Sequence, residues 1–292
     1  MNAKPDPIRR VGLVANVEKP GVGQLLGRAA ELLTARGLAV TADAATARLL
    51  PRGFARAATC ARVARGADLL LVFGGDGTIL RVVREIAGQP TPVLGIHVGR
   101  LGFLAEVAAD RFERAVEQLV TGDFTVEERP LIEAEVAGRR TRLTALNDFV
   151  LSRGVVSRMI ELGVAVDGEE LTRYRCDGLI VSSPTGSTAY SLAAGGAIVS
   201  PGAEVFTLTP ICPHTLSNRS VIVALEAEVA VRVLSERLPV QLTADGQVQV
   251  ELGAGDRVVM RRSSRAVRLL HPGGNSFFKT LRQKLHWGGS ND

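Results

Sequence analysis

The sequence is poor in aromatic residues and cysteine, and both shortages limit what the chain can be. Only 4% of its 292 residues are Phe, Trp or Tyr, so the core must consist mainly of Leu, Val, Ile and Ala. The three cysteines, Cys60, Cys176 and Cys212, lie far apart, which excludes a disulfide framework and a paired metal-ligand spacing. We therefore expect a reduced, cytoplasmic protein.

Long apolar runs and a strong charge of one sign are also missing. No apolar stretch approaches the roughly 20 residues of a membrane-spanning helix, and residues 1–7 lack the apolar core of a signal peptide. The net charge of +5 is modest, and the arginines are scattered without an aromatic stacking platform. We expect small anionic ligands as partners, and neither nucleic acid nor a membrane.

The pattern of strands and helices changes near Gly122. Before it, apolar runs alternate with helical patterns, which is typical of a covered parallel sheet. After it, short β-branched runs alternate with turns such as Asp167-Gly168, which is typical of antiparallel sheets packed face to face. We expect an α/β domain with a parallel sheet over residues 1–122 and an all-β sandwich over residues 123–274. Residues 275–292 are expected to return to the first domain, through a helix that packs back on it.

The elements of the first domain can be placed from their patterns. The expected strands cover residues 10–17, 38–42, 69–73 and 92–98, and the expected helices cover residues 21–37, 54–65 and 108–120.

Three glycines and an aspartate follow the expected strand at residues 69–73, in the run from Gly74 to Thr78. Apolar residues at helical spacing come next, so the run forms a strand-to-helix turn at the carboxyl end of a strand. Open α/β sheets bind ligands at this edge, and glycines there let the backbone approach a phosphate closely. Asp76 has two interpretations, a helix cap or an acid that takes a proton from a hydroxyl group.

An earlier glycine pattern imitates a dinucleotide-binding fingerprint. Gly21, Gly23 and Gly27 follow the first expected strand, and Asp43 lies about twenty residues after the first of these glycines. However, residues 18–20 separate the strand from the glycines, and the third glycine is one position late. We interpret these glycines as a loop and the start of a helix.

Two segments of the second domain carry unusual polar residues. Asn147 and Asp148 interrupt an apolar strand, which fits either a bulge or a bound nucleoside that satisfies both side chains. Residues 173–196 lead from a strand into a cluster of Ser, Thr and Gly. This cluster fits either an ordinary turn or a pocket for a flat polar ligand that Tyr190 covers.

The glycine turn resembles the diphosphate-binding turn of NAD kinases, 6-phosphofructokinases and the diacylglycerol and sphingosine lipid kinases. Later segments are similar to bacterial NAD kinases alone, in the same order along nearly the whole chain. They are Asn147-Asp148, Asp177 through Gly196, Thr209 through Ser217, Asp245-Gly246-Gln247 and Lys284 through Trp287. The family usually has Asn where His97 stands, so this chain has a titratable group there.

The resemblance implies transfer of the γ-phosphoryl group of ATP to the 2′-hydroxyl of the adenosine ribose of NAD, giving NADP and ADP. Asp76 is then the general base, Gly75, Gly77 and Thr78 shape the phosphate-binding turn, and Asn147 and Asp148 bind the nucleoside portion of NAD. The residues implied to line the dinucleotide pocket are Asp177, Thr188, Ala189, Tyr190, Ser191, Leu192 and Ala193, with Arg158, Arg175 and Gln247 as further contacts. Arg175 is a candidate determinant of substrate choice, because a guanidinium can favour or reject a 2′-phosphate.

The resemblance also implies a divalent cation, Mg²⁺, carried by ATP, and a homodimer or homotetramer. Two other functions stay open at this point. One is a lipid or sugar kinase that uses the same glycine turn, and the other is a non-catalytic NADP(H) sensor in which Asp76 only caps a helix.

Overall fold

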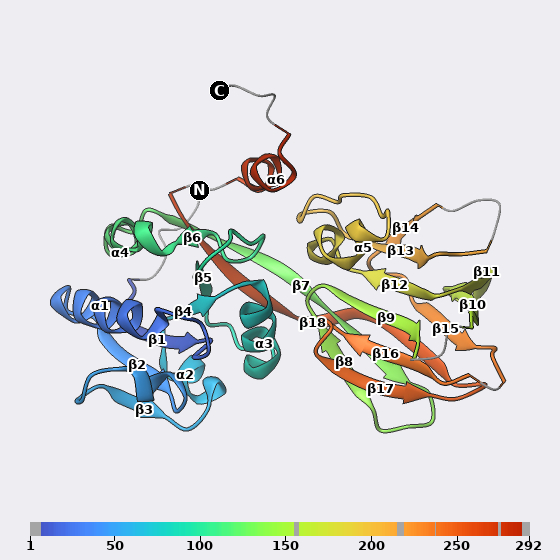
Figure 1. Cartoon of the computed structure of the whole chain (residues 1–292), viewed down its shortest axis with the longest axis horizontal. Coiled ribbons are helices and arrows are strands. Elements are labelled where there is room, and N and C mark those ends of the chain that lie inside the picture. The colour runs from blue at the N-terminus through green and yellow to red at the C-terminus, as the bar shows by residue number, and fades with distance from the viewer. Residues whose placement is uncertain (1–6, 155–157, 215–218, 237, 274–275, 288–292) are drawn as a thin grey trace. The chain divides into compact units, whose positions relative to one another are not determined.

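The computed structural model describes residues 7–154, 158–214, 219–236, 238–273 and 276–287 (Figure 1). It divides into two compact units, unit 1 with residues 1–128 and 267–292, and unit 2 with residues 129–266. Residues 215–217 of the matched motif, and 275 and 288–292 of the C-terminal segment, lie outside the described residues.

Unit 1 is built on a parallel sheet with the strand order β3-β2-β1-β4-β5. The short strand β6 and the end of β18 both pair with β5 in parallel. Every residue of β4 is buried, as its uninterrupted apolar sequence predicts. The strands are β1 (Arg10–Ala15), β2 (Ala39–Asp43), β3 (Ala55–Ala57), β4 (Leu69–Gly74), β5 (Val93–His97) and β6 (Val107–Ala108).

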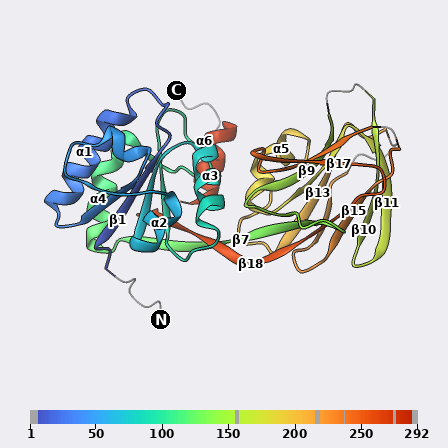
Figure 2. The ribbon, with the colours of Figure 1, turned by 90° about the horizontal axis from the view of Figure 1, so that it is seen from below.

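Helices cover both faces of this sheet. Leu69, Leu71 and Phe73 of β4 share one apolar core with α1 and α4. Gly12 and Gly95 face the other side, where α2 and α3 approach closely. Figure 2 shows α1 and α4 near one another and α3 on the other side of the strands. The helices are α1 (Val22–Ala35), α2 (Cys60–Gly66), α3 (Asp76–Ile86), α4 (Phe112–Thr121) and α6 (Phe277–Leu285), with short 3₁₀ helices at Thr46–Leu49 and Ala109–Arg111.

The helix expected at residues 54–65 is wrong in its first half. Residues Ala55–Ala57 form β3, which pairs with β2, and the helix begins only at Cys60. The side chain of Thr59 accepts a hydrogen bond from the backbone N–H of Arg62 and so caps the helix at this point. The C-terminal helix α6 belongs to unit 1, where Lys284 Nζ lies 5.5 Å from the ring centroid of Phe103. Across the residues that the structure describes, no helix is both long and apolar enough to span a membrane.

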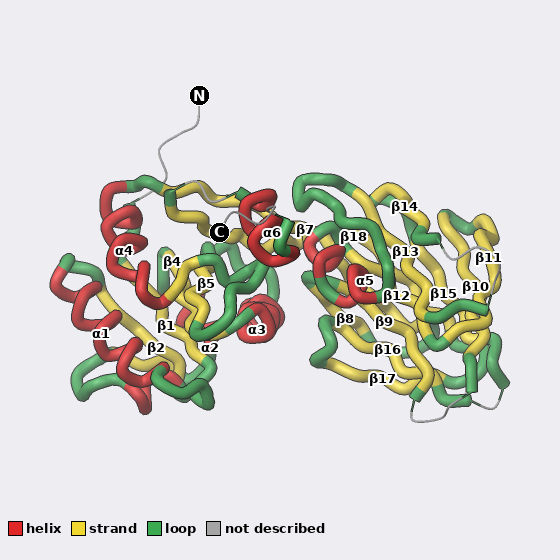
Figure 3. Tube along the Cα trace, turned by 45° about the horizontal axis from the view of Figure 1, so that its top comes forward, coloured by secondary structure: helices red, strands yellow, loops and turns green. Residues whose placement is uncertain are grey.

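Unit 2 is an antiparallel sandwich of two sheets, and Figure 3 shows its strands joined by loops, with the short helix α5 among them. One sheet has the order β14-β13-β12-β9-β16-β17, and the other contains β11-β10-β15-β18 with β7 and β8 beyond β18. Phe149, Leu179 and Phe206 of the first sheet pack in one core with Leu162 and Met260 of the second. The pairing of β12 with its neighbours β9 and β13 determines which of the candidate site residues lie at the same end of this sheet.

The bounds of the elements in unit 2 follow the chain. They are β7 (Phe124–Val136), β8 (Arg142–Ala145), β9 (Asp148–Arg153), β10 (Ile160–Val166), β11 (Glu169–Cys176), β12 (Gly178–Ser182), a 3₁₀ helix (Thr185–Thr188), α5 (Tyr190–Ala193), β13 (Val205–Ile211), β14 (Val221–Ala224), β15 (Val229–Val233), β16 (Val240–Ala244), β17 (Val248–Leu252) and β18 (Arg257–Pro272), of which β7 and β18 continue into unit 1.

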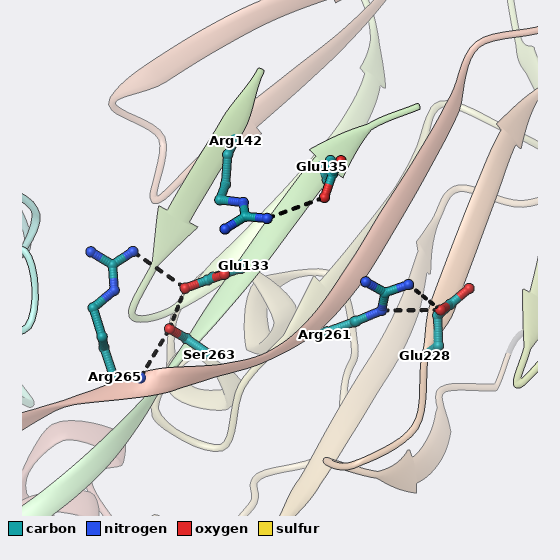
Figure 4. Close-up of polar contacts among 7 residues, drawn as sticks. All are labelled: Glu133, Glu135, Arg142, Glu228, Arg261, Ser263 and Arg265. Carbon is teal, nitrogen blue, oxygen red and sulfur yellow. Dashed lines mark hydrogen bonds and ion pairs between the residues drawn. The ribbon is translucent and has the colours of Figure 1, made fainter. Parts of the chain in front are cut away.

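Ion pairs lie along the polar side of β7 and β18 in unit 2 (Figure 4). Glu133 accepts from the hydroxyl of Ser263 and from Arg265 Nη2 at 3.2 Å. Burial alone would raise the pKa of Glu133, but these donors outweigh it and lower the pKa. The neighbouring pair Arg261–Glu228 is more exposed, and such pairs contribute at most about 1 kcal/mol each.

A charge cluster centred on the buried His271 joins β7 and β18 within unit 1. His271 Nδ1 lies 2.8 Å from Glu106 Oε2, and its Nε2 lies 3.2 Å from Glu127 Oε2. Burial alone would lower the pKa of His271, but the two glutamates outweigh it and raise the pKa to about 9. His271 is therefore a positively charged link between two carboxylates at neutral pH.

This cluster predicts a loss of stability at alkaline pH. The contribution of His271 is complete below its unfolded pKa of about 6.5 and disappears as the pH rises through about 9. The difference in unfolding free energy between the wild type and His271→Gln should shrink by about 3 kcal/mol over that range, as measured by urea unfolding. The exposed His286 offers the control His286→Gln, which should follow the wild type. The same pH dependence in His271→Gln and the wild type would contradict the assignment.

Candidate active site

The glycine turn lies where the sequence predicts it, at the carboxyl end of β4. β4 ends at Gly74, Gly75 precedes the helix in an extended conformation, and α3 begins at Asp76. A Cβ on Gly74 would lie 2.3 Å from Thr78 Oγ1, so the close approach of helix and strand requires glycine there. A Cβ on Gly75 or Gly77 would meet no atom within 4 Å, so the turn is open at both positions.

Both carboxylate oxygens of Asp76 accept hydrogen bonds from the loop that follows β5. Oδ2 accepts from the backbone N–H of Phe103 at 2.8 Å, and Oδ1 accepts from Leu104 and Ala105 at 3.0 Å each. A Cβ on Gly102 would lie only 1.9 Å from Oδ1, so the loop folds around this carboxylate. The described hydrogen bonds to the Asp76 carboxylate come from residues 103–105 and not from α3, so they do not support a helix cap.

His97 ends β5 and pairs in register with Gly74, the last residue of β4. Its Nδ1 lies 2.9 Å from the carbonyl oxygen of Gly99, so the imidazole supports the start of the same loop. The contact of this loop with Asp76 could not be found from the sequence, since 27 residues separate Asp76 from Phe103.

In unit 2, Asn147 and Asp148 lie at the junction of β8 and β9. Asp245, in the turn between β16 and β17, accepts hydrogen bonds from the backbone N–H groups of Leu146, Asn147 and Asp148 at 2.9, 2.7 and 3.2 Å. Asp148 is only 4% exposed. Its burial and then the charge of Asp245 raise the pKa of Asp148 to about 7.

The Ser/Thr-rich segment combines a structural part and an accessible part. The buried hydroxyl of Ser183 donates to the carbonyl of Leu146 and accepts from the N–H of Gly186, and Ser187 Oγ accepts from the N–H of Val199. The hydroxyl of Ser191 is likewise buried, 3.0 Å from Thr209 Oγ1. These residues shape the turn, whereas the accessible ones are Thr188, Ala189, Tyr190, Leu192 and Ala193, with Tyr190 48% exposed.

The residues predicted for the dinucleotide pocket fall into two groups in unit 2. Asp148 pairs with Ser182, while Ser152 pairs with Gly178 at the other end of β12. Asn147, Asp148, Gln247 and residues 188–193 therefore lie toward the Ser182 end of the sheet, and Asp177 lies at the opposite end, ~17 Å away along the strand.

Arg158 and Arg175 belong to the second group, because Ile160 pairs with Cys176 beside Asp177. Both arginines are exposed. Asp177 forms an ion pair with Arg153, with Oδ1 2.8 Å from Nε. The sequence singled out neither Arg153 nor the role of Asp245. The carboxylate contacts of Asp245 depend on residues almost 100 positions earlier.

The described residues hold no group of three or more His, Cys, Asp or Glu side chains that could bind a metal ion.

Two family models match the chain, the ATP-NAD kinase N-terminal domain at residues 11–124 and the ATP-NAD kinase C-terminal domain at residues 146–272. The NAD kinase of Methylibium petroleiphilum is 40% identical over 286 residues, which cover 96% of this chain and 95% of that protein. The NAD kinase of Moorella thermoacetica is 42% identical over 288 residues, which cover 97% of this chain and 91% of that protein.

Solved structures agree with these relatives. Yeast NADH kinase complexed with NADH has a TM-score of 0.88 at 26% identity, covering 98% of this chain and 90% of that chain. An NAD kinase from Archaeoglobus fulgidus in complex with ATP has a TM-score of 0.76 at 27% identity, covering 96% and 100%. This chain belongs to the ATP-NAD kinase family.

Proposed function

We propose that this chain is a kinase that transfers the γ-phosphoryl group of ATP to the 2′-hydroxyl of the adenosine ribose of NAD, giving NADP and ADP. The observation that carries the mechanism is the carboxylate of Asp76, which lies at the start of α3 within a turn that is open at Gly75 and Gly77. Both halves of the chain match NAD kinases, which disfavours a lipid or sugar kinase and a non-catalytic sensor.

Asp76 acts as the general base in this proposal. An ionised carboxylate offers about four acceptor positions, and the loop amides use one on Oδ2 and two on Oδ1. The remaining position on Oδ2 accepts the ribose hydroxyl proton, while the hydroxyl oxygen attacks the γ-phosphorus and the bond to ADP breaks. The three hydrogen bonds from backbone N–H groups fix the position of the carboxylate during this step, so the base is oriented before the substrate binds.

The glycine turn binds the phosphates. Backbone N–H groups at the start of α3 and its positive dipole end attract phosphate oxygens, and no Cβ on Gly75 or Gly77 hinders their approach. Mg²⁺ on the phosphates would neutralise charge in the transition state. Thr78 is nearly buried against Gly74, so its part is to shape the turn.

A cavity of about 590 Å³ on the same edge of the sheet is the candidate site for the nucleoside of ATP. Asp43 at the end of β2, Thr59 after β3, and Arg81 and Glu85 of α3 line it. Its volume lies in the usual range of ligand pockets. Because α3 begins at Asp76 and also lines the cavity, a nucleotide bound there extends its phosphates toward the glycine turn.

In this proposal, residues of unit 2 bind NAD. Asn147 and Asp148 bind the nucleoside portion, and Tyr190 with its accessible neighbours covers the ligand. Arg158, Arg175, Asp177 and Gln247 are proposed as further contacts, with Arg175 affecting the choice among dinucleotides. We also propose a homodimer or homotetramer that acts in the cytoplasm.

The base assignment predicts the kinetics of Asp76→Asn. NADP formation should fall about 10²- to 10⁴-fold, while NAD binding, measured by calorimetry, should change little because the proposed NAD contacts are in unit 2. Asp68→Asn is a matched control, since Asp68 precedes the same strand and also accepts from backbone N–H groups, those of Arg9 and Arg10. Its turnover should match the wild type, and near-normal turnover in Asp76→Asn would remove Asp76 as the base.

The packing of Gly102 against Asp76 predicts a second effect. The methyl group of Gly102→Ala would lie 1.9 Å from Oδ1, so the loop or the carboxylate must move. A shift of this kind should lower kcat about 10²-fold. In α1, Gly27→Ala meets no atom within 4 Å and should leave kcat unchanged, as expected if the early glycines are not a nucleotide site. Unchanged kcat in Gly102→Ala would show that the loop does not position the base.

A further inference from the structure

Asp245 occupies a tight turn that brings it against the residues proposed to bind NAD. It has φ of +50° and Gly246 has φ of +64°, a conformation that Asp and Gly tolerate well. The backbone N–H of Asp245 donates to the carbonyl of Asp148 at 3.0 Å. Its carboxylate accepts from three consecutive N–H groups, those of Leu146, Asn147 and Asp148. The turn is therefore bound to this segment by four hydrogen bonds.

The same segment is held from its other side. The carbonyl of Asn147 accepts from the N–H of Ser183 at 2.8 Å, and the carbonyl of Leu146 accepts from the Ser183 hydroxyl at 2.5 Å. A Cβ on Gly186 would lie 2.2 Å from the carbonyl oxygen of Asn147, so the segment and the Ser/Thr-rich turn are packed tightly. The backbone of residues 146–148 is fixed by groups on β12, on the turn after it and on the β16–β17 hairpin.

Among the described residues, the carboxyl group of Asp148, unlike the backbone of residues 146–148, is not held by hydrogen bonds. No hydrogen bond from the described part of the chain reaches the carboxyl group of Asp148, although the residue is only 4% exposed. Across β12 it is paired with Ser182, which is uncharged, and beyond β16 it faces the carboxylate of Asp245. Burial and that like charge are the causes that raise the pKa of Asp148 to about 7.

We infer that Asp245 is a positioning residue for the proposed NAD site, which fixes the Leu146–Asp148 backbone and keeps a proton on Asp148 for donation to the substrate. The inference rests on the proposed function. A protonated carboxyl donates one hydrogen bond and still accepts another, whereas an ionised one only accepts. Asp148 can therefore bind a ribose oxygen or a ring nitrogen of a nucleoside as a donor, which two ionised aspartates side by side could not do.

The surroundings of Asp148 and Asp245 also explain why Asp245 is the ionised member of the pair. Three backbone N–H groups point at its oxygens, and hydrogen bonds of this kind favour the ionised carboxylate. Asp148 has burial and a neighbouring negative charge instead. Below about pH 7 the pair therefore favours the state with one proton, and that proton is on Asp148.

The test is the pH dependence of the KM for NAD, measured together with kcat in the wild type, Asp245→Asn and Asp148→Asn. In the wild type, the KM for NAD should rise as the pH passes about 7, because Asp148 loses its proton. Asp148→Asn should remove this rise, since an amide donates at every pH. Asp245→Asn removes the like charge, so the rise should move about one unit toward acid, and the KM for NAD should increase about tenfold with lost backbone hydrogen bonds.

Asp167→Asn is the matched control. Asp167 has the same positive φ of +50° before Gly168, and its carboxylate accepts from the backbone N–H of Glu228 in a different hairpin. It should change neither the KM for NAD nor its pH profile. Thermal unfolding of each variant separates a folding defect from a local one, and a ¹³C titration of the Asp148 carboxyl in Asp245→Asn reports the proton without turnover.

The outcomes separate the inference from the proposed function. A wild type that makes no NADP from ATP and NAD contradicts the proposed function itself. The inference is overturned if the wild type is active but Asp245→Asn changes neither the pH dependence of the KM for NAD nor the titration of Asp148. A profile that shifts only in kcat would also overturn it, because a positioning residue of the NAD site acts through substrate binding.

Discussion

In each of the two units, the candidate site residues depend on a carboxylate that accepts hydrogen bonds from three consecutive backbone N–H groups. Asp76 holds residues 103–105 in this way in unit 1, and Asp245 holds residues 146–148 in unit 2. Charged acceptors make stronger hydrogen bonds than neutral ones, so each aspartate fixes a loop that regular secondary structure leaves unpaired. In unit 1 the carboxylate is itself the proposed base, whereas in unit 2 it supports neighbouring residues.

The two carboxylates of the unit 2 pair differ through their surroundings alone. Asp245 has N–H donors, and Asp148 has apolar burial and a like charge, which raises its pKa to about 7. Desolvation of this kind is costly unless a ligand supplies the missing partner. In the proposed NAD site, the buried carboxyl of Asp148 therefore links packing with function, because the group that burial destabilises is the one proposed to bind the nucleoside.

Local patterns carried the sequence predictions that succeeded. The apolar run at 69–73 and the helical spacing after Gly77 depend on neighbouring residues, and the strand, turn and helix lie where these patterns place them. The short strand β3 was missed because its residues were assigned to the following helix. That helix begins only at Cys60, after its cap Thr59. The contacts of Asp76 and Asp245, and the separation of Asp148 from Asp177 at opposite ends of β12, could not be predicted, because sheet pairing and long-range hydrogen bonds decide them.

The contacts of Asp76 and Asp245 also differ in the number of residues that separate the two partners along the chain. Asp76 reaches residues 27 to 29 positions later, whereas Asp245 reaches back over 97 to 99 positions. The conformational entropy lost on closing a loop grows with the logarithm of its length. Closing the loop at Asp245 therefore costs about 1 kcal/mol more than closing the loop at Asp76.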